Sequence, residues 1–283
     1  MTQPAVTFQI RQLEEQLDTR LFDRAQGRIS LTVAGAIALE YADRILALSA
    51  ELDSRMKELS GQFAGPLLIG ASTTIADFLL PQILGAFKGR YPAVVPRLFV
   101  ANSEAVQVRI VERSLDLAFI EGESHLPTLG ADVCCEDELQ VVCAPSHSLA
   151  KQSCATPQSL LEHGYISREV GSGTREVIDK YLEKAGLDSD SLQVVMEAGS
   201  PEALKGLAAT GLGFAIMSRA TVAKEVRLGE LVRVPLAPRL IRNLSVVYPK
   251  ERFHSSLIKT FVEFAKERFA GVQDAYEYAE RPA

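Results

Sequence analysis

The strongest restriction on the fold comes from a long stretch without proline, residues 32–60. Its only glycine, Gly35, lies near the start, so we expect one continuous helix here. Apolar residues recur along it at spacings of three and four: Ala38, Tyr41, Ile45, Leu48, Leu52, Met56 and Leu59. This period is close to 3.5 residues, which leaves a narrow apolar seam for a partner helix. The stretch therefore predicts a linker helix that pairs two copies of the chain, and a helix packed on its own domain is the alternative.

Residues 3–18 predict a second, amphipathic helix. Thr2 can cap it, and Pro4 lies in the first turn, where a missing N–H costs nothing. One face is an apolar stripe of Val6, Ile10, Leu13 and Leu17. The other face carries polar and cationic side chains: Gln3, Thr7, Gln9, Arg11 and Gln12. Such groups suit DNA phosphates and base edges, although a solvated amphipathic helix has the same pattern.

Residues 21–31 predict a short hairpin, because apolar residues flank a polar tip that contains Gly27. Arg24 and Arg28 lie beside that tip, where the wing of a DNA-binding domain touches the backbone. Residues 1–31 hold four arginines and four acidic residues, and the whole chain has a formal net charge of −6. Any affinity for DNA must therefore come from the placement of these arginines and not from bulk charge.

After a Gly-Pro linker at residues 61–66, apolar runs alternate with helical segments. We expect strands at 67–70, 97–100, 115–120, 139–143, 165–166, 193–196, 213–217, 231–234 and 244–248, and a last helix at 255–269. This alternation predicts an α/β fold with parallel sheets. Two such sets, joined near Pro145 and Pro238, predict two Rossmann-like lobes with a cleft between them. Lobe I would comprise residues 66–144 and 241–270, and lobe II residues 145–240.

Four short segments resemble LysR-type transcriptional regulators in order and spacing: residues 2–7, 9–14, 21–24 and 31–35. The resemblance implies three parts. These are a partial winged helix-turn-helix at residues 1–31, a linker and dimerisation helix at 32–60, and an effector-binding domain at 66–283 that resembles a type 2 periplasmic binding protein. Residues 167–175 also resemble family members that govern carbon dioxide fixation and cysteine metabolism. The resemblance further implies a homodimer or homotetramer.

By this resemblance, residues 2–17 look like the recognition helix for a dyad-symmetric promoter site in double-stranded DNA. The implied DNA-binding residues are Thr2, Gln3, Pro4, Thr7, Gln9, Arg11, Arg24 and Arg28. Base contacts specify and phosphate contacts position, so Gln3 would carry more sequence information than Arg28. In the family a helix and part of a second precede such a recognition helix. We therefore expect a chain that was truncated, or assigned from an internal methionine, and that binds DNA poorly by itself.

The effector is expected at helix starts that follow buried strands. Hydroxyl and amide side chains gather there: Ser72, Thr73 and Thr74; Asn102 and Ser103; Ser172, Gly173 and Thr174; and Ser200. Free N–H groups and the positive helix end bind anions, and ligands bind at the carboxyl ends of strands in such sheets. We expect a small-molecule anion there, with Arg168 as a counter-charge. Ordinary helix capping is the alternative for each turn.

Other protein classes fit less well. The first residues lack the basic segment and apolar core of an export signal, and no run reaches the roughly 18 apolar residues of a membrane helix. We therefore expect a cytoplasmic protein without a membrane partner, whereas a solute-binding protein of periplasmic type without DNA-binding activity is the alternative. The latter would leave residues 1–60 unexplained.

Catalytic and metal-site motifs are also missing from the sequence. The segment 171–174 looks like a phosphate loop but lacks its lysine, and the histidines are scattered, so we expect no enzyme and no cofactor. The cysteines form no Cys-x-x-Cys pair: Cys134, Cys135, Cys143 and Cys154. We expect free thiols and no metal site, with a redox sensor at Cys134 and Cys135 as the alternative.

Overall fold

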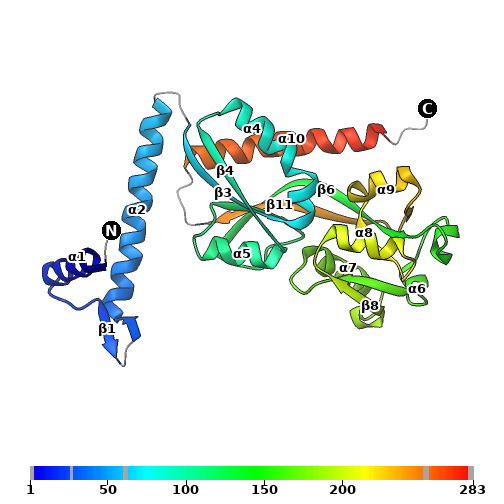
Figure 1. Ribbon diagram of the computed structural model, residues 1–283, viewed down its shortest axis with the longest axis horizontal. Helices are drawn as coiled ribbons and strands as arrows, with labels where there is room; N and C mark the ends of the chain where they lie inside the picture. The colour runs from blue at the N-terminus through cyan, green and yellow to red at the C-terminus, as the bar shows by residue number, and fades with distance from the viewer. Residues whose placement is uncertain (1–2, 26–27, 60–62, 251–254, 280–283) are drawn as a thin grey trace. The chain divides into compact units, whose positions relative to one another are not determined.

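The computed structural model describes residues 3–25, 28–59, 63–250 and 255–279 (Figure 1). The chain divides into two compact units, Met1–Ser60 and Gly61–Ala283.

The first unit contains two helices and a hairpin. Helix α1 (Gln3–Gln16) is followed by strands β1 (Phe22–Ala25) and β2 (Arg28–Leu31), which pair antiparallel, and then by helix α2 (Val33–Leu59). The Thr32 hydroxyl accepts a hydrogen bond from Gly35 N at 2.9 Å and so caps α2. A Cβ at Gly35 would overlap the Leu21 carbonyl, so α2 passes the chain before the hairpin at a distance that only glycine permits.

The predicted seam on α2 is exposed within this chain. Its side chains Tyr41, Ile45, Leu48, Leu52 and Met56 are more than half exposed, and Ala38 is half-buried. The α1 stripe is also largely exposed at Val6, Leu13 and Leu17. Within the first unit, the described residues leave these apolar side chains uncovered.

The second unit is built on a seven-stranded mixed sheet. Its strands are β3 (Gly65–Ser72), β4 (Val94–Ala101), β5 (Leu117–Glu121), β6 (Leu129–Cys143), β9 (Ala215–Ser218), β10 (Val232–Val234) and β11 (Leu240–Pro249). The order is β10-β6-β11-β5-β3-β4, with β9 also paired to β6.

Parallel pairing in this sheet is limited to β3 with β4 and β3 with β5. Strand β11 runs antiparallel to β5 and to β6, and β6 runs antiparallel to β9 and β10. The expectation of wholly parallel sheets is therefore wrong. The reason is that β6 and β11 each pass from one lobe to the other, and each runs antiparallel to the strands that pair with it.

Each of the two lobes has an apolar core of its own. One core, around Ile69, Phe87, Phe119 and Phe261, includes α10 (Ser256–Ala279). A second core packs β6 and β9 against lobe II helices around Leu182. Residues 139–143 were expected in lobe I, but they pack in lobe II cores. Strands β6 and β11 therefore belong to both lobes and connect them.

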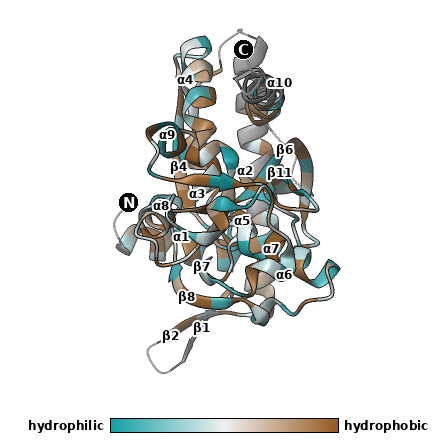
Figure 2. Cartoon of the chain, turned by 90° about the vertical axis from the view of Figure 1, so that its right-hand side faces the viewer, coloured by the Kyte–Doolittle hydropathy of each residue, from teal (hydrophilic) through white to brown (hydrophobic). Residues whose placement is uncertain are grey.

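Lobe II also has a two-stranded parallel sheet, β7 (Gly164–Arg168) and β8 (Gln193–Ala198). Apolar residues recur along β8 (Figure 2), and Val194, Val195 and Met196 are exposed. The other short elements are η1 (Ser148–Lys151), α6 (Pro157–Leu160), η2 (Ser189–Ser191), η3 (Arg219–Val222) and α9 (Ala223–Leu228).

The remaining helices follow strands directly. They are α3 (Thr73–Phe78) with α4 (Leu80–Arg90) after β3, α5 (Ser103–Val111) after β4, α7 (Gly173–Lys184) after β7, and α8 (Pro201–Ala209) after β8. Pro81 lies in the first turn of α4, where its missing N–H costs nothing. The turns before α3, α5, α7 and α8 place polar residues at the carboxyl ends of their strands.

Candidate functional site

Hydrogen bonds between the lobes bring three of the four predicted helix starts together. The Asn102 side chain donates to the Val170 carbonyl at 3.2 Å, and Glu104 N donates to the Gly171 carbonyl at 3.1 Å. Arg168 Nη2 donates to Thr73 Oγ1 at 3.1 Å. These contacts join α3 and α5 of lobe I to the β7–α7 turn of lobe II, so the cleft between the lobes is closed.

The fourth helix start behaves differently. Ser200 Oγ accepts a hydrogen bond from Ala203 N at 3.2 Å, which makes it the N-cap of α8. Among the interactions of the described chain, none joins the Ser200 side chain to lobe I, although the next residue, Pro201, lines a small space in the cleft.

Two serine hydroxyls in the cleft region are buried without a partner. Ser72 is 1% exposed and Ser172 is 3% exposed, and neither Oγ has a hydrogen-bond partner in the described part of the chain. Both stand at N-cap positions, yet neither side chain caps its helix. Asn102, by contrast, accepts from Ala105 N at 3.0 Å and caps α5. An unpaired buried hydroxyl is costly and identifies a group available to a ligand.

The predicted counter-charge, Arg168, is 3% exposed. Its Nε and Nη2 donate to the Glu169 carboxylate at 2.8 and 3.0 Å. The guanidinium is therefore already matched by a neighbouring charge, while Nη2 also reaches Thr73. An incoming anion would share Arg168 with Glu169.

Four polar residues, three of which the sequence reasoning missed, meet at the centre of the cleft, and we call Glu121, Thr174, Arg242 and Asp137 the cross-lobe network. Thr174 Oγ1 donates to Glu121 Oε2 at 3.0 Å and accepts from Arg242 Nη1 at 2.7 Å. Arg242 Nε donates to Asp137 Oδ2 at 2.8 Å. Only Thr174 was predicted. Glu121 had one signal in the sequence, a carboxylate directly after the apolar run of residues 117–120.

Opposing effects set the pKa values of Glu121 and Arg242 in the cross-lobe network. Burial raises the pKa of Glu121, but the charge of Arg242 and the hydroxyls of Thr74 and Thr174 outweigh it and hold that pKa below its usual value. Burial lowers the pKa of Arg242, yet the carboxylates of Glu121 and Asp137 raise it overall. The centre of the cleft therefore holds two carboxylates around one guanidinium.

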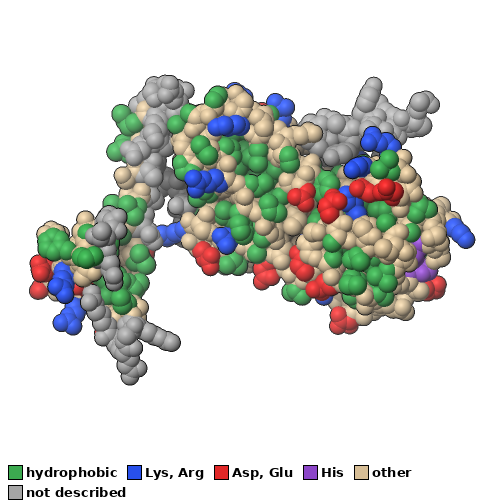
Figure 3. All heavy atoms as spheres, in the orientation of Figure 1, with side chains coloured by type: hydrophobic (Ala, Val, Ile, Leu, Met, Phe, Trp, Pro, Cys, Tyr) green, Lys and Arg blue, Asp and Glu red, His purple; other side chains and the backbone are tan. Residues whose placement is uncertain are grey.

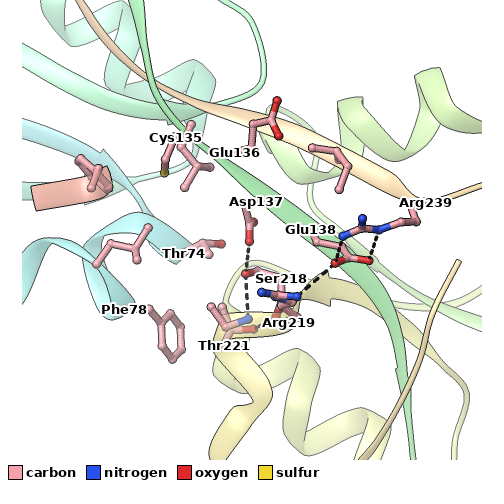
Figure 4. Close-up of a pocket in the computed structure, with 15 residues that line it drawn as sticks. Thr74, Phe78, Cys135, Glu136, Asp137, Glu138, Ser218, Arg219, Thr221 and Arg239 are labelled. Atoms are coloured by element: carbon pink, nitrogen blue, oxygen red, sulfur yellow. Dashed lines mark hydrogen bonds and ion pairs between the residues drawn. The ribbon is translucent and has the colours of Figure 1, made fainter. Parts of the chain in front are cut away.

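The space inside the closed cleft is unevenly distributed. A cavity of about 460 Å³ lies between Ser103 of lobe I and Ser172 of lobe II, but the space at the cross-lobe network is small. A cavity of about 10 Å³ lies among Thr74, Arg168, Thr174, Ser218 and other residues, and this is room for about one water molecule. A neighbouring cavity of about 230 Å³ shares Thr74 and Ser218 in its lining (Figure 4). At its edge the Glu138 carboxylate pairs with Arg239 at 2.7 Å.

Metal and thiol chemistry have little support here. Over the described ranges, no group of three or more His, Cys, Asp or Glu side chains could hold a metal ion. Burial raises the pKa of the Cys134 thiol to about 11 and that of Cys135 to about 12, so both are protonated at neutral pH. Because the thiolate is the reactive form, this disfavours the redox sensor. Among the described helices, none is long and apolar enough to span a membrane.

Comparison with known proteins decides the family. The profile described as "LysR substrate binding domain" matches residues 60–270, and that described as "Bacterial regulatory helix-turn-helix protein, lysR family" matches residues 1–36. The chain belongs to the LysR family of transcriptional regulators. LysR regulators bind DNA and small-molecule effectors, and the predicted resemblance is thus confirmed.

Relatives of this LysR regulator carry one recurring name. Proteins named "Probable RuBisCO transcriptional regulator" are 37% identical over 267 residues in Cyanophora paradoxa (93% of this chain, 82% of that one) and 33% identical over 274 residues in Trichormus variabilis (95% and 81%).

Solved structures confirm the fold, an effector-binding domain like a type 2 periplasmic binding protein. The Synechocystis CcmR regulatory domain, solved in complex with 2-PG, is 26% identical with a TM-score of 0.66 over 72% of this chain and 96% of that one. Corynebacterium glutamicum OxyR has a TM-score of 0.71 over 100% and 89% of the two chains, at 19% identity.

The residues predicted to contact DNA lie in the first unit of this LysR regulator. Pro4, Gln9 and Arg11 are exposed on α1, and Thr7 is half-buried. The other four are placed only in part: Thr2 lies outside the described residues, Gln3 begins α1, Arg24 lies in β1 and Arg28 lies in β2. The hairpin register pairs Ala25 with Arg28, next to the tip.

Proposed function

We propose that this LysR-family regulator senses a small organic phosphate of the 2-PG kind in the cleft between its lobes. The observation that carries the proposal is a pair of buried hydroxyls, Ser72 from lobe I and Ser172 from lobe II. Neither has a hydrogen-bond partner among the described residues. Hydroxyls and helix-start N–H groups bind phosphate oxygens well. The likeness to the CcmR regulatory domain with 2-PG supports this ligand class.

The proposed effector residues are those of the predicted helix starts. Ser72, Thr73 and Thr74 would act from lobe I with Asn102 and Ser103, and Arg168, Ser172, Gly173 and Thr174 from lobe II. Ser200 would contribute only as the cap of α8. The names of the relatives support genes of carbon dioxide fixation as the target. Binding would favour one angle between the lobes about β6 and β11, and the linker helix would pass that bias to the DNA-binding heads.

We further propose that residues 1–31 bind DNA, residues 32–60 dimerise and residues 66–283 sense the effector. The exposed α2 seam supports a pair of linker helices, and a two-fold dimer fits a dyad-symmetric site. Exposed apolar side chains on β4 and α5 (Figure 3), among them Val95, Leu98 and Val108, support further contacts between sensing domains, which would make a tetramer.

Calorimetry on three variants tests the effector site. The ligands are 2-PG, inorganic phosphate and sulfate, screened first by thermal shift, because a ligand of the native state raises the melting temperature. Thr73→Val and Ser172→Ala should each weaken 2-PG binding by about 1–3 kcal/mol. Ser200→Ala is the matched control and should leave the affinity unchanged. Equal affinity in all the proteins would place the site elsewhere.

A further inference from the structure

The closed cleft already contains a carboxylate, that of Glu121. The residue ends β5, at the carboxyl edge of the sheet where the effector is expected, and it is 1% exposed. Its lowered pKa keeps it ionised at neutral pH. An ionised carboxylate buried in a ligand cleft costs free energy unless its interactions repay the loss of water.

Glu121 is bound by groups of the kind that would bind an anionic effector. Thr174, from lobe II, donates its hydroxyl to Glu121 Oε2 at 3.0 Å, and Arg242 Nη1 lies 3.5 Å from the same oxygen. Glu121 N donates to Ser103 Oγ at 3.3 Å, which fixes the strand end against α5. The contact with Thr174 crosses the cleft, so it exists only while the lobes are closed.

The two larger cavities of the cleft region, of about 230 and 460 Å³, include neither Glu121 nor Thr174 in their lining. The space between Thr74, Arg168 and Thr174 holds about 10 Å³, roughly one water molecule, whereas an organic phosphate is several times larger. A ligand that uses the Thr174 hydroxyl must therefore take the place of Glu121.

We propose that Glu121 is an internal ligand of the cleft: its carboxylate joins the lobes when the cleft is closed and competes with the effector for Thr174 and Arg242. The inference rests on the proposed function for the identity of the competing anion. It also gives Glu121 a role in specificity. A ligand must bind Thr174 and Arg242 more strongly than the buried Glu121 carboxylate does, and it must remain bound with that charge nearby. Both requirements favour ligands with several acceptor oxygens and more than one negative charge.

Glu121→Gln tests the competition by calorimetry with 2-PG and inorganic phosphate. The amide has the same shape but lacks the charge, so binding should tighten by roughly tenfold or more. Glu123→Gln is the matched control, because it makes the same change of charge two residues further along the chain. The Glu123 side chain is 75% exposed, and its partner Lys180 lies on α7, as Thr174 does. The control should bind as the wild type does. A Glu121→Gln affinity equal to or weaker than wild type would overturn the proposal.

A ligand-free measurement separates this inference from the proposed function. The Glu104 amide donates to the Gly171 carbonyl across the cleft, so its hydrogen-exchange protection reports closure. Protection should fall in Glu121→Gln and in Glu121→Asp, which keeps the charge but withdraws the carboxylate from Thr174. Unchanged protection in Glu121→Asp would refute the internal ligand even if Glu121→Gln did not fold. If no protein binds 2-PG or phosphate but the Glu121 variants lose protection at the Glu104 amide as expected, only the proposed effector is refuted.

Discussion

Gly173→Ala should open the cleft without unfolding either lobe. A Cβ at Gly173, the first residue of α7, would overlap the Glu121 carbonyl oxygen and lie 2.7 Å from Ser103 Oγ. Ordinary contact with a Cβ begins at 3.4 Å, so lobe II must withdraw by more than half an ångström. Overpacking of this kind costs about 1–3 kcal/mol. Because each lobe has its own core, we expect this cost to destabilise the closed arrangement of the lobes and not the fold of either lobe.

Hydrogen exchange in the absence of ligand measures the effect. A cost of about 1–3 kcal/mol corresponds to a roughly 5- to 150-fold loss of protection at the Glu104 amide, while the melting temperature stays close to that of the wild type. Gly206→Ala in α8 is the matched control, because no atom lies within 4 Å of its added Cβ. Wild-type protection at Glu104 in Gly173→Ala would refute the close approach of α7 to lobe I on which this reasoning depends.

Three further outcomes are expected. The pKa of Glu121 is lower in the folded chain, so its stabilisation is present above the unfolded pKa and is lost as pH falls through the folded one. Urea titrations from pH 7 downward should therefore show a smaller loss of stability in Glu121→Gln than in the wild type, the remainder coming from other carboxyls with lowered pKa values, such as Glu138. Iodoacetamide at pH 8 should label exposed Cys154 well before Cys134, because the raised pKa of Cys134 keeps its thiol protonated. Equal labelling of the two thiols would contradict the burial of Cys134. Leu52→Glu should weaken the dimer by placing a charge in the linker seam, and light scattering that finds the same mass as the wild type would argue against that seam.

The predictable parts of this fold are those whose signals are local. The linker helix follows from the absence of proline and from a period that needs only neighbouring residues. The helix starts after β3 and β4 lie together because the carboxyl ends of neighbouring parallel strands meet at one edge. The start after β7 belongs to a separate sheet and joins them only across the cleft. Ser200 shows the limit of this rule, since its sequence context matches the others but its hydroxyl only caps α8.

The unpredictable parts depend on residues distant in the sequence. Arg242 and Asp137 are 105 positions apart and meet only because β11 pairs with β6. The first half of β6 was missed because residues 130–137 are exposed or half-buried and carry charges at Asp132 and Glu136, so the stretch lacks the apolar run that indicates a strand. With that half missing, no pattern could show that β6 and β11 join the lobes.

The charges of the cleft decide how an anion could be recognised there. Arg168 is matched by Glu169, and Arg242 lies between Asp137 and Glu121, so neither guanidinium offers an unopposed positive charge. A sensor with an open cationic site would bind many anions. Here recognition must combine neutral donors with displacement of an internal carboxylate, which makes affinity depend on the number of acceptor oxygens as well as on charge. The same displacement breaks a bond between the lobes, so ligand selection and lobe movement become one event.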